Sequence, residues 1–241
     1  MSPTFSAQTQ LGWQAGMLSA RPGRPGEPPL PPGLHLMSGG GGSHDADAES
    51  ALFVPPGTAG AALPLVVLLH GATSHPAQVL PILQGEAERR GILLLAPKSR
   101  EYSWDIIRGD FGPDIAVLDR LLIEVFEHFE VDPARIALAG FSDGASYALS
   151  VGLVNGELFS RILAFSPGFL VPGRRSGKPA IFISHGNADG VLPIQRCSRR
   201  IVPQLRADGY PVDYREFAGG HTVPADLATA AVEPLAPAPG S

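Results

Sequence analysis

Residues 136–155, IALAGFSDGASYALSVGLVN, decide how this chain is interpreted. The first five residues are typical of a buried strand, and the run that begins at Ala145 is typical of a helix. Between them lies Gly140-Phe141-Ser142-Asp143-Gly144, a G-x-S-x-G pattern. A serine at the tip of such a turn has a strained backbone, and side chains in place of the glycines would collide with the strand and the helix. The pattern therefore predicts an exposed Ser142 hydroxyl at a helix N-terminus.

This strand, turn and helix together resemble the nucleophile elbow of α/β-hydrolases, in which the serine attacks a carbonyl carbon. The helix N-terminus and the backbone N–H of Asp143 would then face a developing oxyanion. The Asp143 carboxylate itself is interpreted as a helix-end charge without a catalytic role. The alternative is a plain glycine-rich turn, but the position between a strand pattern and a helix pattern favours catalysis.

The rest of the chain alternates short apolar runs with longer amphipathic ones, which is typical of crossover units on a mostly parallel sheet. The clearest helix pattern covers residues 114–130, where apolar side chains recur every three or four positions. Six strands are expected at residues 63–69, 92–96, 135–139, 161–165, 180–184 and 212–217. Apolar stretches at residues 34–37 and 51–54 bring the expected number to eight. The sequence predicts an α/β fold with helices on both faces of a mostly parallel, eight-stranded sheet.

Length and proline content set the expected domain boundaries. A chain of 241 residues fits one α/β domain. Residues 1–33 are expected to form a Pro/Gly-rich extension that ends in an extended connector over residues 21–33. The α/β-hydrolase domain is expected over residues 34–231, and a flexible tail over residues 232–241. The glycines of residues 39–43 are expected in a hairpin loop and not in a phosphate-binding loop, because no Gly-Lys-Ser/Thr follows them.

Composition excludes several classes of function. The net charge is −5, so no broad positive field is available to bind nucleic acid or anionic membranes. The single cysteine, Cys197, excludes an intrachain disulfide and a cysteine-rich zinc site, and we expect it to be a packing residue. No Lys or Arg precedes Arg21, and the longest apolar run, residues 61–69, is too short to span a bilayer. We therefore expect a cytoplasmic protein without stable membrane insertion.

A nucleophilic serine needs a base to take its proton and a third group to orient that base. In the chain order of α/β-hydrolases both follow the serine, which leaves His185 and His221 as candidate bases. His221 is favoured because it follows the last expected strand and has glycine neighbours, the alternative being a surface-loop histidine. Asp189 follows the strand at residues 180–184 and is expected to accept the second ring N–H of His221. The alternative is an Asp-Gly turn residue, and His185 is interpreted as structural.

The second oxyanion donor is expected from the loop after the strand at residues 63–69. Gly71 permits a tight bend that aims the N–H of Ala72 at the same place as that of Asp143. His70 is expected to brace this loop. The histidines and nearby acids lack a compact ligand spacing, so no metal site is predicted.

Two aromatic residues are candidates for substrate contacts. Trp104 follows the strand at residues 92–96 and would reach the same sheet edge, where it would wall an acyl pocket. The alternative is that Trp104 only plugs a loop. Phe169 begins the apolar run of residues 169–171, which is expected on the rim of the site as a contact for the acyl tail.

Four motifs together resemble the phospholipase/carboxylesterase family of α/β-hydrolases, which includes acyl-protein thioesterases. In chain order they are LLHGA (68–72), GFSDGAS (140–146), SHGNADGVLP (184–193) and AGGHTVP (218–224). Many relatives have Gln where this chain has Asp143, and the proline-rich extension is not part of the shared pattern. These departures leave the substrate open.

The resemblance implies an α/β-hydrolase fold with a Ser142/Asp189/His221 triad and an oxyanion hole at Ala72 and Asp143. It also implies hydrolysis of carboxylic esters or thioesters without a cofactor. The substrate would be a small-molecule ester.

The interval between Ser142 and Asp189 must hold a helix, two strands and a loop, which leaves no room for a lid domain. An open site favours short to medium or single-chain acyl esters, cleaved through an acyl-enzyme. A thioesterase or lysophospholipase, and a serine peptidase or acyltransferase, are alternatives on the same fold. A non-catalytic binding protein is a remote alternative, because such a protein is expected to have lost a triad member. A homodimer is left open.

Overall fold

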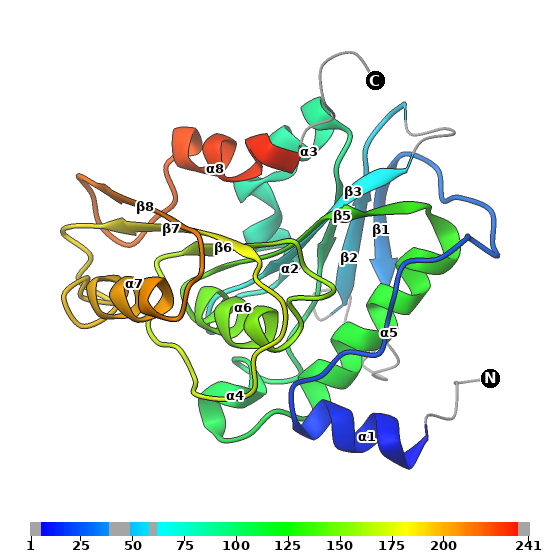
Figure 1. Ribbon diagram of the computed structural model, residues 1–241. Coiled ribbons are helices and arrows are strands. Elements are labelled where there is room, and N and C mark those ends of the chain that lie inside the picture. The colour runs from blue at the N-terminus through cyan, green and yellow to red at the C-terminus, as the bar shows by residue number, and fades with distance from the viewer. Residues whose placement is uncertain (1–5, 39–48, 58–61, 236–241) are drawn as a thin grey trace.

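The computed structural model describes residues 6–38, 49–57 and 62–235, which form one sheet with helices on both faces (Figure 1). Its strands are β1 (Gly33–Met37), β2 (Ser50–Val54), β3 (Leu63–Leu69), β4 (Leu93–Ala96), β5 (Val131–Phe141), β6 (Arg161–Phe165), β7 (Ala180–Gly186) and β8 (Val212–Phe217). They form an eight-stranded sheet in the order β1-β2-β4-β3-β5-β6-β7-β8. β2 runs antiparallel to both of its neighbours, and the other pairs are parallel. The expected fold class is confirmed.

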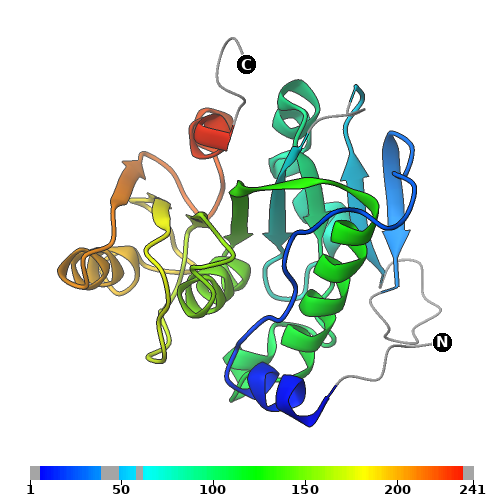
Figure 2. The same ribbon diagram turned by 45° about the vertical axis from the view of Figure 1, so that its right-hand side comes forward.

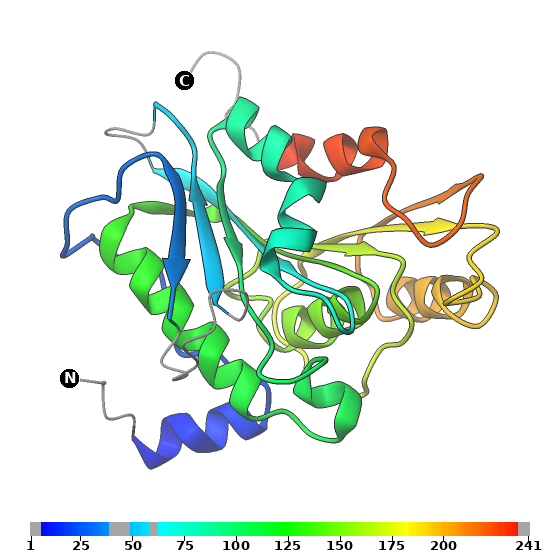
Figure 3. The same cartoon turned by 180° about the vertical axis from the view of Figure 1, so that it is seen from behind.

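Helices form a layer on each face of the sheet (Figures 2 and 3). One face is covered by α1 (Ala7–Gln14), α4 (Asp105–Arg108), α5 (Pro113–His128), α6 (Asp143–Val154) and α7 (Ser198–Ala207). The other is covered by α2 (Pro76–Val79), α3 (Gln84–Arg90) and α8 (Ala225–Val232), with the 3-10 helices η2 (Leu80–Ile82) and η3 (Glu233–Leu235). No helix within the described ranges is long and apolar enough to cross a bilayer.

The position of each strand in the sheet explains its sequence. β3 lies between β4 and β5, and all of its residues are buried, as its continuous apolar run predicts. β8 lies at the sheet edge and alternates half-buried Val212 and Tyr214 with exposed Asp213 and Arg215. β5 begins at Val131, earlier than the expected strand at residues 135–139, because Val131 pairs with Leu63 ahead of a register shift.

The expected helix at residues 114–130 is α5. Pro113 is its first residue, where a proline loses no hydrogen bond, and Asp114 lies in the first turn near the positive end of the helix dipole. Ile115, Leu118 and Leu122 are completely buried against the sheet. These residues form the predicted apolar stripe.

The N-terminal segment packs against the domain through a buried carboxylate on α5. Asp119 accepts hydrogen bonds from Trp13 Nε1 (2.8 Å), Ser19 N (2.8 Å), Ser19 Oγ (2.6 Å) and Ala20 N (2.7 Å). Packed structure therefore begins well before residue 33. At the other end Val232 and Leu235 are buried, so packing continues past residue 231. The glycine-rich residues 39–43, expected in a hairpin loop, lie outside the described ranges. The strands on either side of them, β1 and β2, are described and pair antiparallel.

Candidate active site

Three loops at the carboxyl edge of the sheet bring Ser142, Asp189 and His221 together. Ser142 lies between β5 and α6, Asp189 follows β7, and His221 follows β8. The Nε2 of His221 lies 2.9 Å from Ser142 Oγ, and its Nδ1 lies 2.6 Å from Asp189 Oδ2. The three side chains singled out by the sequence thus form one hydrogen-bonded row, in the order that proton transfer from a serine requires.

The turn that carries Ser142 depends on two glycines. Ser142 has φ 58° and ψ −121°, a positive-φ conformation that residues with side chains rarely adopt. A methyl group on Gly140 would fall on the Gly144 carbonyl, and one on Gly144 would fall on two carbonyl oxygens at the end of β3. The strand and the helix therefore approach more closely than side chains allow, which holds the Ser142 hydroxyl clear of the sheet.

The loop of His221 is held close to the end of β7. A methyl group on Gly186 would fall on the backbones of Gly219 and Gly220, and the Gly219 carbonyl accepts a hydrogen bond from the N–H of Ala188 at 2.9 Å. Gly186 was not predicted as a site residue, although a glycine at a strand end is a signal of close backbone approach. This contact brings the loop of His221 beside the loop of Asp189.

The Phe141 ring lies against the His221 ring, with the two centroids 4.7 Å apart. Phe141 directly precedes the serine, so one turn supplies both the hydroxyl and a wall for the imidazole. The His221 side chain is 16% exposed. It is therefore held on one side and accessible from the cavity on the other.

Asp189 is a buried anion with three hydrogen-bond donors. Its Oδ1 accepts from the N–H groups of Val191 (2.9 Å) and Leu192 (2.8 Å), and its Oδ2 accepts from His221. Burial by itself raises the pKa of Asp189, but the N–H of Leu192 and the His221 ring outweigh burial and hold that pKa below its ordinary value. The carboxylate is thus ionised and fixed in the orientation that directs His221 Nε2 toward Ser142.

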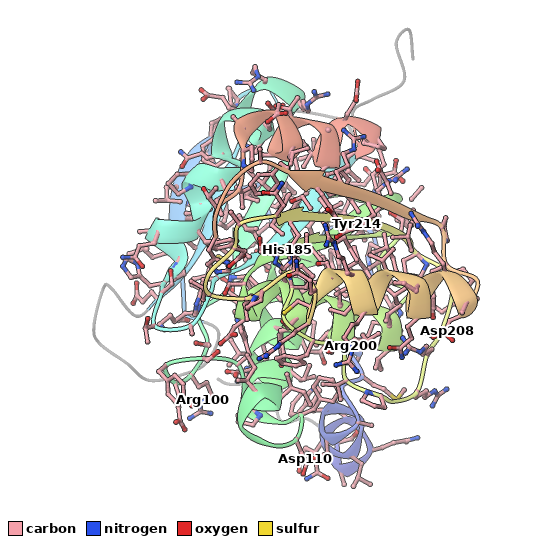
Figure 4. All side chains as sticks on the ribbon, turned by 90° about the vertical axis from the view of Figure 1, so that its left-hand side faces the viewer. Arg100, Asp110, His185, Arg200, Asp208 and Tyr214 are labelled. Atoms are coloured by element: carbon pink, nitrogen blue, oxygen red, sulfur yellow. The ribbon has the colours of Figure 1, made fainter. Side chains whose placement is uncertain are left out.

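A second imidazole, that of His185, lies beside Asp189 between β7 and α7 (Figure 4). It is completely buried, with Nδ1 2.7 Å from Ser198 Oγ and Nε2 2.8 Å from the Leu192 carbonyl. Burial lowers the pKa of His185 and favours the neutral ring. His185 thus lies under the turn that carries Asp189, where a structural residue was expected.

The residues of both expected oxyanion donors lie near Ser142. Asp143 is the first residue of α6, where backbone N–H groups have no partner within the helix. Ala72 lines the same cavity as Ser142. A methyl group on Gly71 would lie 3.4 Å from Ser142 Cβ, so the turn before Ala72 packs directly on the serine.

Neither Trp104 nor Phe169, both within the described ranges, lines the cavity beside Ser142. Trp104 is 1% exposed, its ring stacks on Tyr147 of α6, and its indole N–H donates to the His70 carbonyl at 2.8 Å. Trp104 therefore does not form the expected pocket wall. It matches the alternative, a residue that fills a loop. Phe169 is half-buried, with its N–H 3.4 Å from Ser146 Oγ, because its loop folds back onto α6.

A cavity of about 480 Å³ opens beside Ser142. Its walls come from the turn after β3, the α2–η2 segment and the loops after β7 and β8. The larger apolar side chains of the lining are those of Val79, Ile82, Phe141, Val191 and Val223. The four valine and isoleucine residues were not predicted from the sequence. The one available signal was the three-residue spacing of Val79 and Ile82, which is typical of a helix that buries one side.

The described part of the chain holds no cluster of three or more His, Cys, Asp or Glu side chains that could bind a metal ion. Cys197 is 5% exposed and packs at the start of α7. Burial raises the pKa of its thiol, which favours the unreactive protonated form.

Comparison with known proteins agrees with the fold. Residues 115–225 match the phospholipase/carboxylesterase family. The structure of esterase PE8 is 27% identical with a TM-score of 0.63, over 76% of this chain and 95% of that chain. The carboxylesterase of Bacillus cereus is 19% identical with a TM-score of 0.60, over 77% of this chain and 92% of that chain. No curated protein matches the chain.

A fluorophosphonate-binding serine hydrolase of Staphylococcus aureus is 13% identical with a TM-score of 0.64, over 85% of this chain and 99% of that chain. This structure and that of the Bacillus cereus enzyme support the fold alone. The sheet, the elbow and the esterase likeness define a carboxylesterase-type hydrolase with the α/β-hydrolase fold. Over residues 115–225, the chain is similar to the phospholipase/carboxylesterase family.

Proposed function

We propose that this hydrolase cleaves carboxylic esters by attack of Ser142 on the carbonyl carbon, with His221 as general base and Asp189 as the group that orients it. The observation that carries the proposal is the unbroken row of hydrogen bonds. The distance from Ser142 Oγ to His221 Nε2 is 2.9 Å, and the distance from His221 Nδ1 to Asp189 Oδ2 is 2.6 Å. Both distances are within reach for the transfer of a proton to a base that a carboxylate orients.

The proposed reaction has two halves. In the first, Ser142 Oγ bonds to the carbonyl carbon while its proton passes to His221 Nε2, and the carbonyl oxygen becomes an oxyanion. The ester C–O bond then breaks, and the proton moves from Nε2 to the leaving alcohol. In the second, water attacks the acyl-enzyme and gives a proton to Nε2. The bond from the acyl carbon to Oγ breaks, the proton returns to Ser142, and the acid is released.

The oxyanion would be bound by the backbone N–H groups of Ala72 and Asp143. The positive end of the α6 dipole lies behind Asp143, which adds to the stabilisation of negative charge at this position. Such donors act on charge that exists only in the transition state and the tetrahedral intermediate. They therefore contribute to kcat more than to substrate binding.

The cavity favours a neutral, partly apolar substrate. Apart from His221, no described residue in its lining has an ionisable side chain. Phosphate groups in proteins are usually bound by Arg or Lys. We therefore favour short to medium or single-chain acyl esters of small molecules over lysophospholipids. We place the enzyme in the cytoplasm, as expected from its composition. Thioesters share the acyl chemistry and would use the same residues.

A series of p-nitrophenyl esters of increasing acyl length, with a thioester and an anilide included, tests the proposal. We expect Ser142→Ala to lower turnover by several orders of magnitude while the protein stays folded. A fluorophosphonate probe should label Ser142 in the wild type and leave Ser142→Ala unlabelled. Full ester turnover by the folded variant would refute the proposal, and faster cleavage of the anilide would favour a peptidase.

The pH dependence of kcat/KM gives a second test. His221 must be neutral to accept the proton of Ser142, whereas Asp189 stays ionised because its pKa is lowered. We therefore expect kcat/KM to fall as the pH is lowered and the base takes up a proton. A profile that stays flat down to acid pH, while the protein remains folded, would exclude His221 as the base.

A further inference from the structure

Residues 99–104, between β4 and α4, contact both turns that carry the proposed oxyanion donors. We call this segment the bracing loop. Its contacts reach His70 and Thr73 in the turn after β3, and Asp143 at the start of α6. The role of this loop rests on the proposed function, because the loop contacts the turns that hold the two oxyanion donors in place.

His70 connects the bracing loop to the peptide that carries the Ala72 N–H. The N–H of Ser99 donates to His70 Nε2 at 3.1 Å, and the His70 Nδ1 lies 2.7 Å from the Gly71 carbonyl oxygen. Because Nε2 accepts, the proton of the neutral ring is on Nδ1, which donates to Gly71. Burial lowers the pKa of His70 to about 4, so this neutral form persists near neutral pH.

The Gly71 carbonyl and the Ala72 N–H belong to one peptide unit. This peptide is planar and trans, so its C=O and N–H point in opposite directions. A donor that holds the Gly71 carbonyl on one side therefore aims the Ala72 N–H to the other. The N–H of Ser74 donates to the same carbonyl at 3.3 Å and supports this orientation.

Two further contacts hold the turn itself. The Trp104 indole donates to the His70 carbonyl at 2.8 Å, and its ring stacks on Tyr147 of α6 with centroids 4.9 Å apart. The Tyr102 carbonyl accepts from the N–H of Thr73 at 2.6 Å. Thr73 has φ 56°, a conformation that persists only when its surroundings hold it.

The bracing loop also reaches the second donor. Ser103 is completely buried, and its hydroxyl donates to Asp143 Oδ2 at 2.8 Å. This bond turns the Asp143 carboxylate toward the loop. A carboxylate that turned toward the oxyanion instead would oppose the charge that develops there.

We propose that the bracing loop aims both oxyanion donors, with His70 as the positioning residue for the Ala72 N–H and Ser103 as the positioning residue for Asp143. Neither side chain touches the substrate. Loss of either side chain, that of His70 or that of Ser103, should lower kcat and the affinity for a transition-state analogue. KM should stay nearly unchanged.

The Ser103→Ala variant, with Ser150→Ala as its matched control, tests the Asp143 contact. Ser150 is also a buried serine, and its hydroxyl donates to the Ser146 carbonyl at 2.8 Å, away from both donors. We expect Ser103→Ala to lower kcat about 10- to 100-fold, less than the full loss of an oxyanion donor. The affinity for a trifluoromethyl ketone analogue should fall by a similar factor. Equal kcat values for the two folded variants would overturn the role of Ser103.

Two His70 variants separate the two ring nitrogens. The amide nitrogen of Asn lies near the position of Nδ1 and can donate to Gly71, whereas the amide of Gln reaches the position of Nε2 and can accept from Ser99. We expect His70→Asn to keep kcat within a few-fold of wild type and His70→Gln to lower it about 10- to 100-fold. Equal kcat values for both folded variants would overturn the role of His70. Should neither fold, the serine pair decides the proposal.

Failure of this proposal can be told apart from failure of the proposed function. If wild type hydrolyses esters and Ser142→Ala does not, the proposed function stands, and the Ser103 and His70 variants test the bracing loop alone. If Ser142→Ala is fully active, the proposed function is refuted, and the proposal about the bracing loop is overturned with it.

Discussion

The Nε2 of His185 lies 3.3 Å from Asp189 Oδ2, the same oxygen that accepts a hydrogen bond from His221. Two imidazoles therefore share one carboxylate oxygen, but their surroundings differ. His185 is completely buried and bound to Ser198 and Leu192, whereas His221 faces the cavity. Their substitution should consequently have different effects.

We expect His185→Ala to lower the free energy of unfolding by about 1 to 3 kcal/mol, because the Leu192 carbonyl and the Ser198 hydroxyl lose a buried partner. Its kcat should fall by about 10-fold or less, since Asp189 keeps the N–H groups of Val191 and Leu192. His221→Ala should instead lower kcat by several orders of magnitude with little loss of stability. Urea unfolding and ester turnover measured on both variants check this difference. Complete loss of turnover in folded His185→Ala would assign it a direct catalytic role.

The stability of the protein should decrease as the pH is lowered from about 6.5 to about 4. Burial lowers the pKa of His70 from 6.5 to about 4, so in this window the unfolded chain binds a proton that the folded protein does not. The titration of His70 should lower the free energy of unfolding by about 3 kcal/mol across this window. Below pH 4 its contribution should change little. Burial also lowers the pKa of His185, which acts in the same direction.

Urea unfolding at several pH values, on wild type and His70→Asn, measures this contribution. The variant should lose a large part of the pH dependence, because an amide does not titrate. If the free energy of unfolding of the variant depended on pH as strongly as that of wild type, His70 would not be the group responsible.

Asp119 should anchor the N-terminal segment. Substitution by Ala leaves the Trp13 indole N–H and the backbone N–H of Ala20 without their acceptor, and both residues are buried. We expect Asp119→Ala to lower the free energy of unfolding by about 2 to 4 kcal/mol and to make residues 13–20 accessible to protease. Asp208→Ala, in an exposed loop and 3.5 Å from Arg175, is the control and should change little. Equal protease resistance of the two variants would contradict the anchoring role.

Gly144→Ala should destabilise the protein by about 3 kcal/mol or more, because the added methyl group would overlap two backbone carbonyls that cannot move independently. Gly173→Ala is the matched control, since its added methyl group would meet no atom within 4 Å. Thermal unfolding of both variants measures the difference. A Gly144→Ala variant as stable as Gly173→Ala would mean that the elbow can widen.

Several features were predictable because they follow from local chemistry. The buried runs of β3 and β4, the apolar stripe of α5 and the two glycines beside Ser142 each follow from neighbouring residues along the chain. The order in which Ser142, Asp189 and His221 occur was also informative, because parallel strands deliver successive loops to the same sheet edge. These patterns predicted which side chains meet.

Other features depended on contacts between distant segments. Trp104 follows a strand, and that position by itself is compatible with an orientation toward the cavity or toward the interior. Its stacking on Tyr147 of α6 places it in the interior. The N-terminal residues 13–20 have no strong periodicity of their own, and their place is set by Asp119, about a hundred positions away. The apolar lining from Val79, Ile82 and Val223 arises where two segments that are far apart in the chain face each other.

The sequence by itself determined the order of the strands and helices, the tight turn at Ser142 and the identity of the groups that form the hydrogen-bonded row. These properties arise from backbone sterics and from the periodic burial of apolar side chains, which act over a few residues. Only the tertiary structure decided which loop residues face the cavity and which ones brace it. Their directions depend on packing partners far away in the chain, whose positions exist only once the sheet and its helices have assembled.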